Sequence, residues 1–316
     1  MTNGVIRNRI MFHVQHLLGI GHLERALRLS RYLQEAGLRV TIVSGGMPFS
    51  HTAARGCDVI QLDPARAADA GFSQMLDAAG RPVTDIWRAR RAAALLRAFE
   101  EIAPDALMIE MFPFGRRQFS FELLPLLQVA RNRRPAPLIL SSVRDVLVPS
   151  AKPGRTGEAI ARARELFDCI LVHGDAGFLR MEHSYPAAAE LGGRIIYTGY
   201  VTAGTAAADS ILAGHNEVTI SAGGGAVGEA LLMPALQARA HSLQAGNKLW
   251  RVLVGGNAPD GQLQALRSRA PEGVVVEAAR PDFPQMLLNC ACSVSQGGYT
   301  TVLDLLHANA SSLTPS

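Results

Sequence analysis

Short apolar runs alternate with segments of helical periodicity along the whole chain. The first run, at 10–15, is followed by a glycine turn and by a segment, 23–36, in which apolar residues recur every three or four positions. This is the spacing of a helix that lies on a sheet. Further strand-like runs lie at 39–44, 58–62, 106–110, 138–143, 169–173 and 194–198. Nearly continuous apolar strands separated by helices predict a parallel sheet that is covered on both faces.

The same rhythm begins again in the second half of the chain. Small, weakly patterned residues at 202–216 predict a linker. Strand-like runs follow at 217–221, 249–254, 273–277 and 291–295, with helices ending near 240 and spanning 300–308. The predicted fold class is therefore α/β, with two Rossmann-like doubly wound domains at 1–201 and 217–316.

Composition narrows the class of protein. Of the 316 residues, 48% are hydrophobic and 18% charged, which is enough to fill two soluble cores. The net charge of +4 comes from arginines scattered among acidic residues, and no nucleic-acid-binding motif accompanies them. No signal-like segment opens the chain, and no run reaches about 18 apolar residues. A cytoplasmic protein with no nucleic-acid partner is expected.

The first glycine turn lies between the strand at 10–15 and the first predicted helix. Gly19 and Gly21 allow a ligand to approach the backbone closely, and His22 stands at the start of the helix. Exposed N–H groups at a helix N-terminus disfavour the imidazolium, so a neutral His22 can act as a general base. The alternative is a histidine that only caps the helix.

The second glycine turn follows the strand at 217–221. Gly223, Gly224 and Gly225 belong to a G-x-G-x-x-G pattern that ends at Gly228. A dinucleotide site also needs an acid at the end of the next strand, where this chain has Asn257. The pattern therefore favours binding of a phosphate over binding of NAD or FAD, although it is also compatible with a turn that serves only helix packing.

The third turn joins the strand at 291–295 to the last predicted helix. It contains Ser295, Gln296, Gly297, Gly298, Thr300 and Thr301. Glycine N–H groups and a threonine at a helix N-terminus can bind an oxyanion. Two such turns that face one crevice would hold the diphosphate of a sugar nucleotide. No Asp-x-Asp occurs, so neither a carboxylate-held metal nor any other cofactor is expected.

Two further features of the sequence can each be interpreted in two ways. Glu110 ends a strand, where it is either a base or a structural carboxylate paired with Arg116. The apolar segment 116–127 precedes several arginines, which would suit peripheral contact with the inner face of an anionic membrane. The favoured interpretation of that segment is an ordinary helix covering the sheet.

The order of these motifs resembles that of GT-B glycosyltransferases. The most similar group shares the family 28 C-terminal domain and includes the N-acetylglucosaminyl transferase of peptidoglycan synthesis. The resemblance implies an inverting, metal-independent transfer of a hexosyl or N-acetylhexosaminyl group from a UDP-sugar to a saccharide or lipid-linked acceptor. It places Gly19, Gly21 and His22 in the acceptor-side loop, 223–225 in the first donor loop and 295–301 in the diphosphate turn.

The end of the chain departs from this family pattern. In the family, a strand, a proline-containing loop and a helix with donor-binding polar residues follow the diphosphate-turn helix, whereas this sequence stops at Ser316. Four recognisable strands, where a full Rossmann half has about six, predict a truncated second domain. Its fourth strand would then be an exposed edge, and its activity would be in doubt.

Two other functions stay open. Some sugar-nucleotide hydrolases carry a Gly-x-Gly-His-x-x-Arg turn, which Gly19, Gly21, His22 and Arg25 match. A UDP-sugar hydrolase or epimerase on the same fold is therefore the enzymatic alternative. A non-catalytic truncated remnant or binding module is the other.

Overall fold

The computed structural model describes residues 8–17, 20–49, 56–69, 71, 74–202, 213–223, 229–256, 258–259 and 261–314. The chain divides after Val201 into two compact units. Residues 20–25, at the start of the first helix, are an exception, because they belong to the second unit. Residues 203–212 of the predicted linker lie outside the described part of the chain.

A parallel sheet forms the centre of the first unit. Its strands are β1 (Arg9–Val14), β2 (Arg39–Ser44), β3 (Asp58–Gln61), β6 (Ala106–Glu110), β7 (Leu138–Arg144), β8 (Cys169–His173) and β9 (Ile195–Tyr197). Among the described residues these strands follow the order β3-β2-β1-β6-β7-β8-β9, and every neighbouring pair is parallel. The order reverses between β1 and β6, as expected for a doubly wound sheet.

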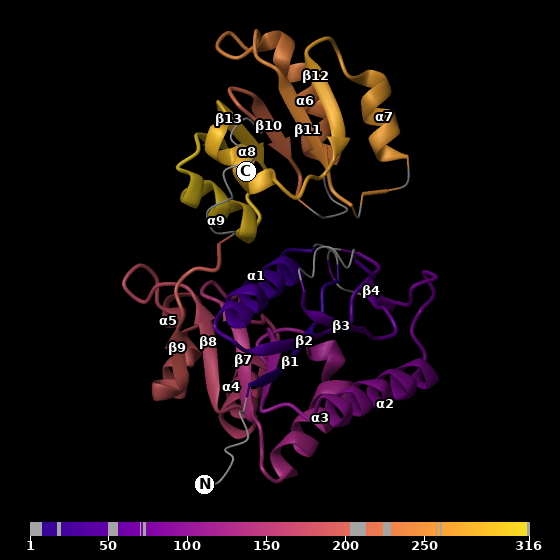
Figure 1. Cartoon of the computed structure of the whole chain (residues 1–316), viewed down its shortest axis with the longest axis vertical. Helices are drawn as coiled ribbons and strands as arrows, with labels where there is room; N and C mark the ends of the chain where they lie inside the picture. The colour runs from indigo at the N-terminus through magenta and orange to yellow at the C-terminus, as the bar shows by residue number, and fades with distance from the viewer. Residues whose placement is uncertain are drawn as a thin grey trace. The chain divides into compact units, whose positions relative to one another are not determined.

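Helices cover both faces of this sheet. They are α1 (Gly21–Glu35), α2 (Asp85–Ile102), α3 (Ser120–Asn132), α4 (Arg155–Leu166) and α5 (Met181–Ser184), with 3₁₀ segments η2 (Arg117–Phe119) and η3 (Pro186–Arg194). Figure 1 shows α1 on one side of the sheet and α2 and α3 on the other. The Thr84 hydroxyl accepts the Trp87 N–H at 3.2 Å and caps α2.

Apolar strand residues account for this arrangement. Phe12, Ile42, Leu107, Ile139 and Ile170, each from a different strand, are all fully buried. A sheet buried on both faces needs such apolar strands. A small antiparallel pair, β4 (Arg66–Ala67) and β5 (Met75–Leu76), is an addition that the sequence did not predict, because two-residue strands have no detectable periodicity.

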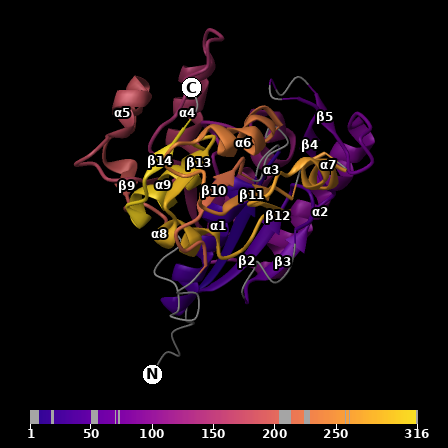
Figure 2. The same ribbon diagram turned by 90° about the horizontal axis from the view of Figure 1, so that it is seen from above.

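The second unit repeats the plan on a smaller scale. Its strands are β10 (Val218–Ser221), β11 (Trp250–Val254), β12 (Val274–Ala278), β13 (Cys292–Ser295) and β14 (Ser312–Leu313), and its helices are α6 (Glu229–His241), α7 (Gln262–Arg269), α8 (Phe283–Asn289) and α9 (Tyr299–Ala308). The described strands are parallel in the order β12-β11-β10-β13-β14, which the labels of Figure 2 follow. Ile220, Val252 and Leu232 lie in a core shared by the sheet and α6.

One prediction about the second unit is wrong. The sequence analysis predicted β13 as the exposed edge of a sheet with four strands. Instead, β14 pairs with β13 in parallel, with Ser312 opposite Ser293 and Leu313 opposite Val294. Because β14 is only two residues long, its sequence carries no strand pattern. Both of its residues are exposed, so the described sheet ends in a short edge strand instead of at β13.

Candidate functional site

The two predicted phosphate turns of the second unit leave adjacent strands. β10 lies between β11 and β13, and the strand order reverses there. Ser221, the last residue of β10, is opposite Ser295, the last residue of β13. The turns that follow them therefore begin side by side at the switch point, where open α/β sheets bind ligands. Gly224 and Gly225 lie outside the described residues.

The described parts of the two turns have the same local construction. Gly223 donates its N–H to Ser221 Oγ at 3.1 Å, and Gly297 donates its N–H to Ser295 Oγ at 3.4 Å. Both glycines have positive φ, +67° and +65°. A Cβ on Gly297 would lie 2.6 Å from Thr314 Cγ2, so both the backbone angle and the space require glycine there.

The turn after β13 leads directly into the N-terminus of α9. Gly298 is the N-cap residue and no side chain caps the helix. The N–H groups of the first turn, which includes Thr300 and Thr301, have no partners within the helix. Gln296 and Gly298 are exposed. This edge therefore offers main-chain donors and the positive end of a helix dipole to an anion.

The carboxyl edge of the first sheet is different, because it is organised by a buried arginine. Arg91 of α2 forms a two-pronged ion pair with Glu122 of α3, at 2.6 and 3.0 Å. It also donates to the carbonyls of Gly45 and Asp63, which follow β2 and β3, and to the side chain of Gln15, which follows β1. Arg91 and Glu122 are both fully buried. One guanidinium thus fixes the ends of three strands.

His16 is the second residue after β1 and is buried. Its ring fills the space where a Cβ on Gly46 would lie, with ring atoms 2.3 to 2.5 Å from that position. Burial, and then the positive charge of Arg116, lower the pKa of His16 to about 4. His16 is therefore neutral at physiological pH.

Glu110, the predicted alternative base, is buried at the end of β6. Its Oε2 accepts a hydrogen bond of 2.8 Å from Ser142 Oγ, at the end of β7. Ser142 Oγ in turn lies 2.9 Å from His173 Nε2, at the end of β8. Arg116, which the sequence analysis considered as the partner of Glu110, donates to the backbone carbonyl of Gln15 at 2.7 Å.

The predicted acceptor-side residues surround the start of α1. Gly21 is its first residue and His22 its second, as the sequence analysis expected. Arg25 lies one turn further on and is 3% exposed. Gly19 lies outside the described residues. The structure thus places His22 in the first turn of α1.

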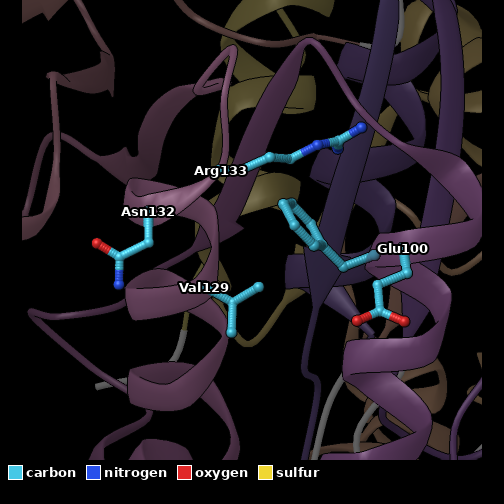
Figure 3. A pocket seen from close by; sticks show the side chains of 5 residues that line it. Glu100, Val129, Asn132 and Arg133 are labelled. Carbon is cyan, nitrogen blue, oxygen red and sulfur yellow. The ribbon is translucent and has the colours of Figure 1, made fainter.

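A pocket of about 440 Å³ lies elsewhere in the first unit. Figure 3 shows its lining side chains at the ends of α2 and α3, among them Glu100, Val129, Asn132 and Arg133. These helices end just before β6 and β7 begin, so the pocket lies at the amino edge of the sheet. It is therefore separate from both strand-end regions.

The described residues contain no group of three or more His, Cys, Asp or Glu side chains that could hold a metal ion. Within the same part of the chain, no helix is both long and apolar enough to cross a membrane. The apolar segment at 116–127 forms the start of α3, whose Leu123, Leu126 and Leu127 are buried in the first unit.

Most of the charged and polar network of the first unit was not predicted from the sequence. Its unpredicted members are Gln15, Arg91, Glu122, Ser142 and His173. A signal was present, since Ser142 and His173 are polar residues near the ends of otherwise apolar strands, as Glu110 is. Arg91 and Glu122 lie on helices, where charged residues are usually solvated, so only the packing reveals their burial.

Two parallel, doubly wound sheets, each with its polar groups at the strand ends, define a pair of Rossmann-like domains. No protein-family model matches the sequence, and the search of curated proteins also gave no match. The fold, however, is shared with solved glycosyltransferase structures. These include UGT2 of Phytolacca americana, complexed with UDP-2fluoro-glucose and pterostilbene, at a TM-score of 0.58 and 12% identity, over 98% of this chain and 80% of that one.

Two further transferase structures match with similar TM-scores. SsfS6 of Streptomyces sp. SF2575, complexed with thymidine diphosphate, matches at a TM-score of 0.57 and 16% identity, over 97% of this chain and 81% of that one. The spinosyn rhamnosyltransferase SpnG matches at 0.57 and 17% identity, over 97% of this chain and 80% of that one. At these identities the likeness establishes the fold, which is that of GT-B glycosyltransferases.

Proposed function

We propose that this protein is a glycosyltransferase that moves a hexosyl or N-acetylhexosaminyl group from a UDP-sugar to an acceptor hydroxyl. The observation that carries the proposal is the pair of glycine turns after Ser221 and Ser295, which leave adjacent strands at the switch point of the second unit. In a fold shared with enzymes solved with UDP-2fluoro-glucose and thymidine diphosphate, that position suits a diphosphate.

The donor diphosphate would bind to main-chain N–H groups. Gly223 and Gly297, whose N–H groups donate to Ser221 and Ser295, would shape the turns and let the phosphates approach the backbone closely. Gly298 and the first turn of α9 would supply donors. These groups would also stabilise the negative charge that develops on the leaving diphosphate, which allows a metal-independent reaction. Thr300 and Thr301 would add side-chain hydroxyls to the same site.

The acceptor would be activated by a base in the N-terminal half of the chain. His22, on the first turn of α1, is the proposed base, and Glu110 is the alternative. The base takes the proton of the acceptor hydroxyl as the oxygen attacks the anomeric carbon, which inverts its configuration.

Turnover of defined donors tests the proposal. Purified protein is incubated with a panel of UDP- and TDP-sugars, with and without a lipid or saccharide extract, and released nucleoside diphosphate is measured. Acceptor-dependent release is expected. Release that needs no acceptor would instead establish a hydrolase, and binding without turnover would establish a binding module.

A pair of histidine variants tests the base. His22→Ala should reduce turnover by about 10²-fold or more and leave donor binding nearly unchanged, because a general base acts on the acceptor. His215→Ala, an exposed histidine in the turn before β10, is the matched control and should retain full turnover. Unchanged turnover in His22→Ala would exclude His22 and direct the same test to Glu110→Gln.

A further inference from the structure

A row of hydrogen bonds crosses the carboxyl ends of four neighbouring strands in the first unit. Ser142 Oγ on β7 donates to Glu110 Oε2 on β6 at 2.8 Å and lies 2.9 Å from His173 Nε2 on β8. His173 Nδ1 lies 2.7 Å from the hydroxyl of Thr198, the residue after β9. Glu110, Ser142 and His173 are buried and Thr198 is exposed. The row therefore leads from a buried carboxyl group to the surface.

The register of the sheet produces this row. Glu110 is directly opposite Ser142, so their side chains leave the same face. Ser142 is opposite Leu171, and His173 is two residues beyond Leu171, which returns its side chain to that face. Val172 pairs with Tyr197, which brings Thr198 level with His173.

Donor and acceptor roles along the row are fixed by chemistry. Because the Ser142 hydroxyl donates its one proton to the carboxylate, its oxygen must accept from Nε2–H of His173. In the neutral ring Nδ1 is then an acceptor for the hydroxyl of Thr198. The alternative acceptors of that hydroxyl, the carbonyls of Val172 and Gly199, are further away at 3.4 and 3.2 Å.

We propose that Ser142, His173 and Thr198 form a relay that exchanges a proton between solvent and the buried Glu110 carboxyl group. Each link has hydrogen-bonding length, and each intermediate group can donate and accept at once. Ser142 and His173 act through Glu110, so they are positioning and relay residues.

The transfer of a proton from solvent to Glu110 conserves atoms and charge. A hydronium ion of the solvent gives a proton to Thr198 Oγ1, whose own proton passes to His173 Nδ1. The proton on Nε2 passes to Ser142 Oγ, and the proton of Ser142 passes to Glu110 Oε2. The carboxylate becomes a neutral carboxylic acid, and His173 changes from its Nε2–H to its Nδ1–H tautomer without carrying a net charge. The outward transfer is the reverse of these steps.

Other ionisable groups surround the row. Arg144 on β7 is opposite His173, and Asp145 follows it with its carboxylate accepting the hydroxyl of Tyr200 at 3.0 Å. Arg116 lies in the segment after β6. Arg144 shares the face of the row with His173, because the two residues are directly opposite in the sheet.

The use of this relay in catalysis rests on the proposed glycosyl transfer, since Glu110 is its alternative base. The relay itself can be tested without turnover. Failure of the transferase assay would therefore leave the relay standing, and failure of the relay would leave the transferase standing.

Nuclear magnetic resonance of the full chain, labelled with ¹⁵N-histidine, provides the test. His173 is assigned by comparison with His173→Gln. In the wild-type protein, lowering the pH should exchange the protonated and unprotonated ring nitrogens of His173 while the ring stays neutral. Direct formation of an imidazolium over the same pH range would overturn the proposal.

Three variants sharpen the result. Ser142→Ala should abolish the tautomer exchange, because it removes the link to Glu110, and Ser142→Thr should retain it as the matched control. Thr198→Val should slow the exchange of the Nε2 proton with solvent, because it removes the surface hydroxyl. A Ser142→Ala protein that still exchanges tautomers, or a Thr198→Val protein with unchanged proton exchange, would contradict the relay.

Discussion

The carboxyl ends of the two parallel sheets carry different chemistry. In the first unit they hold buried ionisable side chains, among them His16, Glu110 and His173, and the buried Arg91–Glu122 pair joins the ends of β1, β2 and β3. In the second unit the strands at the switch point end in serines followed by glycine turns with positive φ. Ionisable groups can move protons, whereas main-chain amides can only bind and stabilise anions.

The difference between the two sheet edges shows how one fold can serve two chemical tasks. The first edge has its charges fixed in place by packing, which suits activation of an acceptor hydroxyl. The second edge leaves N–H groups for a ligand, which suits a diphosphate. Each of the following changes disturbs one edge and should leave the other intact.

The largest effect is expected from the buried ion pair of the first unit. Arg91→Ala should lower the free energy of unfolding by about 3–5 kcal/mol, because it leaves Glu122 buried without its partner. Urea denaturation measures this. The double variant Arg91→Met/Glu122→Leu should recover only part of the loss, because the carbonyls of Gly45 and Asp63 stay without the guanidinium donor. Arg88→Ala, at an exposed pair on the same helix, should cost less than about 1 kcal/mol. Equal losses in Arg91→Ala and Arg88→Ala would refute the organising role of Arg91.

The next effect is a pH dependence that belongs to the first unit. His16 has a pKa of about 4 in the folded protein and 6.5 ordinarily, so the unfolded chain binds the extra proton between these values. The stability from neutral His16 is thus complete above pH 6.5 and is lost as the pH falls towards 4, by up to about 3 kcal/mol.

Urea midpoints measured between pH 7 and pH 4 test this dependence. His16→Gln should flatten the curve in that window, because glutamine does not titrate. A variant with the same slope as the wild type would show that other groups cause the pH dependence.

In the second unit the expected effect is on binding. Gly297→Val should weaken UDP binding at least about tenfold, equivalent to about 1.4 kcal/mol, because Gly297 has φ +65° and its Cβ position is 2.6 Å from Thr314. Titration calorimetry measures the affinity. Gly37→Ala, at a positive φ of +85° with open space around it, controls for backbone strain and should bind UDP normally. Normal binding by Gly297→Val would remove the β13 turn from the site.

The smallest effect contrasts a partly exposed ion pair with the buried one. Arg280 and Asp282 lie 2.6 Å apart in the second unit, with side chains 36% and 27% exposed. Arg280→Ala should change the free energy of unfolding by less than about 1 kcal/mol, and the change should shrink in high salt. A loss as large as that of Arg91→Ala would contradict the distinction between the two pairs.

Much of the fold follows from local pattern. The predicted strands at 39–44, 106–110 and 169–173 coincide with β2, β6 and β8, because long apolar runs bounded by polar residues have few alternatives. The two-residue strand β14 was missed for the opposite reason, since Ser312–Leu313 carries no periodicity. Strand order was also beyond local pattern, because it depends on contacts distant in sequence.

The candidate site, like the fold, could be predicted only in part from the sequence. Glycine turns at Gly223 and Gly297 could be predicted, because glycine marks positions of unusual backbone angle. The row from Glu110 through Ser142 to His173 could not, since it depends on the register of three strands. The predicted roles of His22 and Glu110 in catalysis stay predictions, as does the truncation of the second domain.

The central claim is that main-chain amides at the ends of β10 and β13 bind one diphosphate. The most direct measurement is a titration of ¹⁵N-glycine-labelled protein with UDP, with uridine as the control that lacks phosphate. The account predicts that the amide resonances of Gly223, Gly297 and Gly298 shift together and saturate with UDP and do not respond to uridine. Unchanged resonances at all three glycines, with shifts confined to first-unit glycines such as Gly45 and Gly46, would contradict it.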